Sequence, residues 1–129
     1  SMLSGLGGNF QINDNPLLTS ITHPVSTQTF TYYQVSSCNL DYVNFLPLSG
    51  ATINGDIDLR ANGMTATEVN HILVDFDNLS TNLNPSGWSG VTLDISINAT
   101  PDTTSGGFNG IAAIDSLTGI TNNWSITTS

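Results

Sequence analysis

The sequence predicts an α/β fold: a short solenoid with parallel strands on one face and a helix and irregular returns on the other. An eight-residue pattern recurs along the 129-residue chain, and one of the segments between recurrences has helical periodicity. The recurrences lie too far apart for hairpins, and parallel strands need crossover connections of about a dozen residues or more. We expect a single domain that covers residues 1–129.

The recurring pattern is carried by four segments that align without gaps. They read FQINDNPL, YQVSSCNL, IDLRANGM and LDISINAT and occupy residues 10–17, 33–40, 57–64 and 93–100. Each begins apolar, polar, apolar, which is the alternation of a half-buried strand. A partial fifth copy, WSITTS, begins at Trp124. We therefore expect strands near residues 9–13, 32–36, 56–60, 92–96 and 123–127.

The sixth position of the pattern is filled by a small residue that can bond to the backbone. A strand that turns sharply leaves backbone groups unpaired, and a buried Asn can bond them and form a ladder with its neighbours. Cys is small and tolerates burial. We predict a buried ladder of these residues, with an unreactive cysteine: Asn15, Cys38, Asn62 and Asn98.

The returns between strands differ in length, and each length predicts a structure. The first two returns are short and suit extended or 3₁₀ chain. The third, MTATEVNHILVDFDNL, has one apolar stripe at helical spacing, and Thr65 with Glu68 forms a capping box at its start. The stripe consists of Val69, Ile72, Leu73, Phe76 and Leu79.

A weaker helix is predicted in FNGIAAIDSL, where Ile111, Ile114 and Leu117 align. Because repeats cannot bury their faces alone, we expect Met2–Gly8 and the strand at Trp124 to cap the ends.

The pattern L-x-L-x-x-N/C-x-L makes the chain from Leu6 onward resemble leucine-rich-repeat proteins. GDIDLRANGMTATEVNHIL, GVTLDISINATPDTTSG and NNWSITT are similar to short repeat modules of bacteriophage structural proteins and some bacterial surface proteins. In those modules a strand–Asn turn, a capped helix, an Asn-Ala-x-Pro loop and a terminal Trp strand follow in this order; residues 98–101 and Trp124 take the last two places. The first half departs from them, because its short turns lack helices. The resemblance implies a non-enzymatic binding or structural module in a virion or at an extracellular surface.

The charge balance excludes some partners. The chain has ten acidic residues, one arginine (Arg60), no lysine and a formal charge of −9. It lacks the basic residues with which proteins neutralise nucleic-acid phosphates, and an anionic membrane would repel it. We expect neither nucleic acid nor membrane as a partner.

The candidate site is the outward face of the strands, because the polar residues of each strand alternate with the buried ones. Stacking the repeats would place Asp58 beside Asp94, about 4.8 Å apart along the sheet. Arg60 could neutralise this pair, a cation could bridge it, or water could screen it. The expected rows are Asn9, Tyr32, Asp56, Thr92 and Asn123; Gln11, Gln34, Asp58, Asp94 and Ser125; and Asn13, Ser36, Arg60, Ser96 and Thr127. The face is either a solvated polar surface or a ligand-contacting one, whose candidate residues are Tyr32, Gln34, Asp56, Asp58, Arg60 and Asp94.

The sequence shows little of the pattern that a metal site or a catalytic site would require. Read as a calcium loop from Asp56, the chain puts Arg60 at a ligand position and Glu68 one residue late. The two histidines, His23 and His71, belong to no catalytic motif, and no cofactor motif is present. We predict no metal, no cofactor and no enzymatic activity.

The function expected from these features is recognition: a rigid polar strand face displayed to a protein or glycan partner. The alternative is a purely architectural domain, whose strand face contacts copies of the same chain in a homo-oligomer or a neighbouring structural protein.

Overall fold

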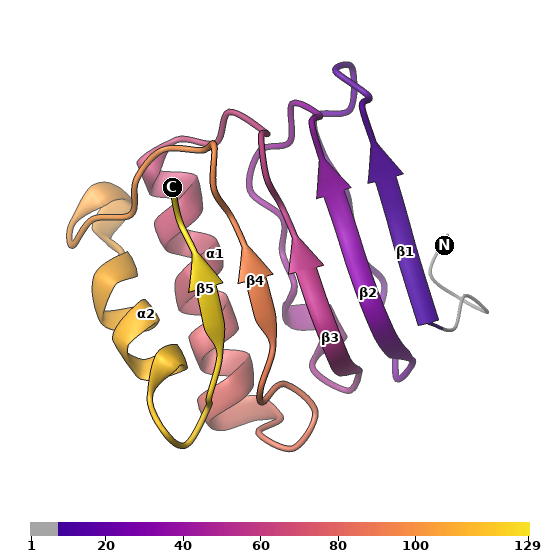
Figure 1. Cartoon of the computed structure of the whole chain (residues 1–129), viewed down its shortest axis with the longest axis vertical. Coiled ribbons are helices and arrows are strands. Elements are labelled where there is room, and N and C mark those ends of the chain that lie inside the picture. The colour runs from indigo at the N-terminus through magenta and orange to yellow at the C-terminus, as the bar shows by residue number, and fades with distance from the viewer. Residues whose placement is uncertain (1–7) are drawn as a thin grey trace.

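The computed structural model describes residues 8–129, so the predicted cap at Met2–Gly8 lies outside the described residues except for its last member. The protein is an α/β structure built on one parallel sheet whose strands follow the chain order β1-β2-β3-β4-β5 (Figure 1). Helices cover the sheet behind its C-terminal half, and irregular returns cover its N-terminal half. The strands are β1 (Gly8–Asn13), β2 (Thr29–Ser36), β3 (Thr52–Asp58), β4 (Thr92–Asp94) and β5 (Ser125–Thr127). The helices are α1 (Ala66–Asn78) and α2 (Gly110–Thr118), with 3₁₀ turns at Leu46–Leu48 and Ser105–Gly107 and a π-helical turn at Leu79–Leu83.

The strand register across β1 to β4 confirms the first two predicted rows; in the third row only Asn13 and Ser36 are paired, because β3 ends at Asp58 and β4 at Asp94, before Arg60 and Ser96. Tyr32 pairs with Asp56 and Asp56 with Thr92, while Asp58 pairs with both Gln34 and Asp94. The prediction for β5 is wrong by two residues, because Ser125 pairs with Thr92 and Thr127 with Asp94.

The shift of β5 follows from the position of Trp124. Its indole Nε1 donates to the carbonyl of Trp88 at 2.7 Å, and its ring packs against Phe76. Trp124 is therefore drawn into the layer behind the sheet, and Ile126 rather than Trp124 becomes the partner of Leu93.

Helix α1 begins and packs as predicted. The Oγ1 of Thr65 accepts from the backbone N–H of Glu68, and the Glu68 carboxylate accepts from the N–H of Thr65, which completes the capping box. All members of the predicted apolar stripe are fully buried: Val69, Ile72, Leu73, Phe76 and Leu79.

The second predicted helix is present as α2, but its inward face differs from the prediction. The buried residues are Gly110, Ala113 and Leu117, whereas Ile111 is 39% exposed. Gly110 lies so close to Asn70 that an added Cβ would stand 2.2 Å from the Asn70 Oδ1. This close approach, rather than a row of large apolar residues, sets the orientation of α2.

The predicted asparagine ladder is confirmed at the two C-terminal turns. The side-chain amide of Asn62 donates to the carbonyls of Val35 and Leu59 at 2.8 and 2.9 Å. One repeat later, Asn98 donates to the carbonyls of Leu59 and Ile95, and its Oδ1 accepts from the backbone of Asn62. Each asparagine thus ties its own turn to the end of the preceding strand.

The burial predicted for Asn15 is wrong, and Cys38 and Asn98 are half-buried rather than buried. Asn15 is exposed and bonds only locally, to the backbone N–H of Leu17. Cys38 is half-buried and its thiol donates to the carbonyl of Ser36 in its own turn. Asn15 follows β1, and no described strand lies on the far side of β1 to offer a carbonyl to it.

The chain turns at each repeat through a left-handed residue directly before the sixth position. These residues are Asp14, Ser37, Ala61 and Ile97, with φ of 55°, 53°, 58° and 54°. None is glycine, and the β-branched side chain of Ile97 is strained in this conformation. At Ile97 the sharp turn is therefore imposed by the surrounding hydrogen bonds rather than by local preference.

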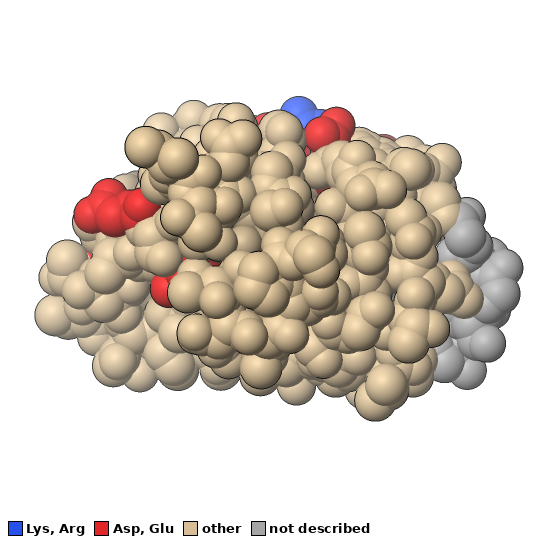
Figure 2. All heavy atoms as spheres, turned by 90° about the horizontal axis from the view of Figure 1, so that it is seen from below, with Lys and Arg blue, Asp and Glu red and all other residues tan. Residues whose placement is uncertain are grey.

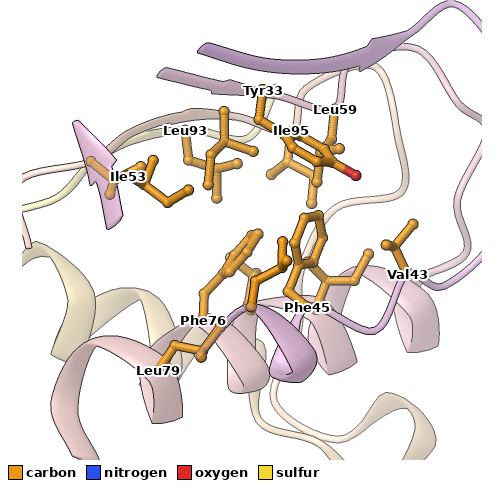
Figure 3. Close-up of a cluster of buried hydrophobic side chains, with 14 of the residues drawn as sticks. Tyr33, Val43, Phe45, Ile53, Leu59, Phe76, Leu79, Leu93 and Ile95 are labelled. Carbon is orange, nitrogen blue, oxygen red and sulfur yellow. The ribbon is translucent and has the colours of Figure 1, made fainter. Parts of the chain in front are cut away.

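The core lies between the sheet and the layer behind it (Figure 3). Tyr33 of β2 and the residues directly after β3 and β4, Leu59 and Ile95, point toward Phe45 and Phe76, which come from the return after β2 and from α1. These side chains are at most 1% exposed. Because this core covers one face of the sheet, the opposite face is open and carries polar groups.

Candidate functional site

The open face of the sheet contains a shallow hollow of about 240 Å³ over β2, β3 and β4. Five of the six predicted site residues line it, and Gln34 lies beside it through a hydrogen bond to Asp58. Thr92 also lines the hollow; it stood in the predicted rows but was not selected as a candidate. The lining residues are Tyr32, Asp56, Ile57, Asp58, Arg60, Thr92 and Asp94.

A ladder of side-chain hydrogen bonds crosses the open face and fixes its central row. The amide of Gln11 donates to Gln34 at 2.8 Å, and the amide of Gln34 donates to Asp58 at 3.0 Å and to Ser36 at 3.1 Å. Gln34 and Asp58 are only 7% and 6% exposed, although they belong to the face without helices. Their partners shield them, so this part of the face is rigid and its polar side chains already have hydrogen-bond partners.

Arg60 neutralises Asp58. Its Nε and Nη2 donate to the two oxygens of Asp58, each at 2.9 Å, and its backbone N–H donates to the same carboxylate. The nearest approach of Arg60 to Asp94 is longer, 3.7 Å from Nε to Oδ2. The hydrogen bond and the charge of Asp58 raise the pKa of Arg60. Seen from below the sheet, the basic group stands beside acidic ones at the rim of a largely uncharged surface (Figure 2).

Two carboxylates of the hollow keep acceptor capacity. Asp94 Oδ1 accepts from the backbone N–H and the hydroxyl of Ser96, but Oδ2 has only the distant Arg60. Asp56 is exposed, and neither of its carboxylate oxygens accepts a hydrogen bond from the described residues. Burial and the charges of Asp58 and Asp56 raise the pKa of Tyr32 despite the opposing effect of Arg60, so its hydroxyl stays protonated.

The two histidines lie outside the hollow, in aromatic clusters. His23 is buried, and its Nε2 is 2.6 Å from the hydroxyl of Tyr33; burial lowers its pKa to about 4. His71 is stacked between the rings of Tyr42 and Phe108, at centroid distances of 3.8 and 4.2 Å.

Tyr42 donates a hydrogen bond to Asp75 beside this stack, and burial raises the pKa of Asp75. These groups join the returns to α1. Among residues 8–129, no three His, Cys, Asp or Glu side chains are grouped so that they could hold a metal ion.

Comparison with protein-family models, curated proteins and solved structures finds no match to this chain. Within residues 8–129, neither helix has the length and apolar character that crossing a bilayer requires.

Proposed function

We propose that this chain is a non-enzymatic recognition and structural module of the leucine-rich-repeat type, which presents its polar strand face to a protein or glycan partner. The observation that carries this proposal is the hollow on the open sheet face, where Tyr32, Arg60 and three aspartates from neighbouring strands meet. Tyr and Arg are enriched where interfaces concentrate binding energy. The hydrogen-bonded ladder beside the hollow supports the proposal, because a preorganised face loses little entropy on binding.

The repeat assignment is supported by features that recur with the sequence pattern. The strands follow one another in the sheet in chain order, the residue before each sixth position is left-handed, and Asn62 and Asn98 bond to the preceding strand. The setting in a phage particle or at a bacterial surface rests on the similarity of the second half to modules of such proteins. Tail or capsid genes adjacent to the coding sequence would support that setting, and their absence would count against a virion role.

An NMR titration of the isotope-labelled protein tests the recognition proposal. The probes are neutral oligosaccharides (cellohexaose, maltohexaose and chitohexaose) and the basic peptide acetyl-Gly-Lys-Gly-Lys-Gly-amide. We expect at least one probe to shift the backbone signals of β2, β3 and β4 around the hollow, and Tyr32→Ala to reduce that response. Leu83→Ala, at an exposed position outside the hollow, is the control. If no probe shifts these signals, or if Tyr32→Ala leaves the response unchanged, the open face is not the recognition surface.

The second candidate function is architectural assembly. It is favoured by the outer edge of β1, which has no neighbouring strand among the described residues and so offers backbone groups for pairing. Light scattering after size exclusion tests it: a stable oligomer would support assembly of copies of the chain, and a monomer would exclude self-assembly through either the β1 edge or the strand face.

A further inference from the structure

We propose that the partner of the open face is a basic protein segment, whose lysine or arginine side chain lies in the hollow between Asp56 and Asp94. This inference rests on the proposed recognition function and names the chemistry of the partner. It follows from the charges that the internal contacts of the face leave uncompensated.

The balance of charge in the hollow is negative. Three carboxylates and one guanidinium line it, and the guanidinium of Arg60 is engaged at both Nε and Nη2 by Asp58. Asp56 therefore has no cationic partner among the described residues, and Asp94 has only the more distant Arg60 at 3.7 Å, on a chain whose formal charge is −9. A cation in the hollow gains attraction from both and meets no other free basic group there.

The geometry suits a side chain with several donors. Asp56 pairs with Thr92 and Asp58 with Asp94, so Asp56 and Asp94 are diagonal neighbours on β3 and β4. Neighbouring strands lie about 4.8 Å apart and rise about 3.3 Å per residue, so the Cα atoms of these diagonal neighbours are about 8 Å apart, which leaves room for an ammonium between the carboxylates. Lysine offers three N–H donors and arginine five, and the Tyr32 ring at the same hollow can take part in a cation–π contact.

A neutral glycan fits these charges less well. Its hydroxyls could bond to Asp56 and Asp94, but covering two carboxylates with an uncharged ligand removes water from them without supplying an opposite charge. A metal ion is disfavoured for a different reason, because both oxygens of Asp58 are already occupied by Arg60. The cation that the hollow selects is therefore one carried on a side chain.

A second copy of the same 129-residue sequence cannot supply that cation. Its only Lys or Arg residue is Arg60, which is held by Asp58 in the same hollow. Two such faces brought together would oppose their aspartates and repel. The charge pattern thus favours a heterologous basic partner over self-association through this face.

The test measures binding of acetyl-Gly-Lys-Gly-Lys-Gly-amide and of the same peptide with norleucine in place of lysine, which keeps the aliphatic chain and removes the charge. We expect the lysine peptide to bind about tenfold more tightly than the norleucine peptide at low salt. Raising the ionic strength from about 0.05 M to about 0.5 M shortens the screening length and should weaken lysine-peptide binding by about tenfold.

Paired variants separate the hollow from the overall charge of the chain. Asp56→Asn/Asp94→Asn should weaken lysine-peptide binding by about tenfold, whereas Asp41→Asn/Asp115→Asn should change it by less than about twofold. Both pairs remove the same charge, and Asp41 and Asp115 are exposed and do not line the hollow. Urea unfolding of both pairs verifies folding, and the norleucine and salt comparisons use the unmodified chain.

The outcomes separate this inference from the proposed function. Equal binding of the two peptides, or an equal loss in both variant pairs, overturns the basic-partner inference. If an oligosaccharide binds at the hollow while the lysine peptide does not, recognition stands and the basic partner is wrong. If neither class binds there, both proposals fail.

Discussion

The asparagines at the sixth position of the repeat test how far the burial of a residue determines its contribution to the stability of the protein. Asn15, Asn62 and Asn98 share the sixth position of the repeat but differ in surroundings. Asn62 is 2% exposed, Asn98 is half-buried and Asn15 is exposed. Replacing each by alanine changes the same atoms, so differences in the loss of stability report on the environment alone.

The loss of stability expected for Asn62→Ala follows from the backbone groups that lose a hydrogen-bond partner. Its amide serves the carbonyls of Val35 and Leu59, and its Oδ1 accepts from the N–H of Leu40. Leu59 retains a second donor in Asn98, whereas Val35 and Leu40 each lose the bond that Asn62 made. A buried group without its partner costs about 1–3 kcal/mol, so the expected loss is about 3 kcal/mol. Asn98→Ala should lose roughly half of that because water can reach its site, and Asn15→Ala less than about 0.5 kcal/mol.

Equilibrium unfolding in urea, followed by tryptophan fluorescence, measures the series. Trp88 and Trp124 are 0% and 4% exposed, so their emission shifts to longer wavelength when the core opens. With a slope of about 2 kcal/mol per molar urea, Asn62→Ala should lower the midpoint by about 1.5 M at unchanged slope. Equal losses at all three positions, or a smaller loss at Asn62 than at Asn15, would refute the argument that the ladder stabilises through buried partners.

Two further substitutions test other features of the fold. The pKa of His23 is lowered from 6.5 to about 4 in the folded protein, so the unfolded chain binds the proton more readily and stability is lost as the pH falls from 6.5 toward 4. Between about pH 7 and about pH 5 the free energy of unfolding should fall by about 2 kcal/mol more in the unmodified protein than in His23→Gln; parallel pH profiles would contradict this. Ile97→Gly should raise the free energy of unfolding by about 1 kcal/mol, because the residue is 71% exposed and has a φ of 54°, a conformation that glycine adopts without strain. A destabilised Ile97→Gly protein in the same urea assay would show that the side chain matters more than the turn.

The sequence predicts the sheet well because two independent patterns agree. Alternation determines which side chains face the core, and the repeat aligns one strand with the next, so the pairing of Asp58 with Asp94 can be predicted without a structure. The register of β5 could not be predicted in this way, because it depends on the hydrogen bond between Trp124 and Trp88, and these two residues do not occupy equivalent positions of the repeat. A strand register that depends on tertiary contacts outside the repeat cannot be predicted from the repeat.

The candidate site was predictable as a set of residues but not as a distribution of charge. Alternation places Asp58, Arg60 and Asp94 on the open face, and the structure brings them together. The sequence left open which carboxylate the arginine would neutralise. The side-chain geometry at the end of β3 decides this in favour of Asp58, because Arg60, two residues after the strand ends, makes two bonds to it at 2.9 Å and stays 3.7 Å from Asp94. The burial of Gln34 was likewise hidden, since it depends on partners in both neighbouring strands.

The turn and the open face are linked through one asparagine. The amide of Asn62 donates to the carbonyl of Arg60 at 3.3 Å as well as to Val35 and Leu59, so it holds the strand end from which Arg60 reaches Asp58. Because this end is fixed, the guanidinium stays with the buried carboxylate and leaves Asp56 uncompensated. A loosened turn would let Arg60 move toward other acceptors and reduce the negative charge that the hollow offers. The stability of the repeat and the charge selectivity that we propose for its face thus depend on the same residue.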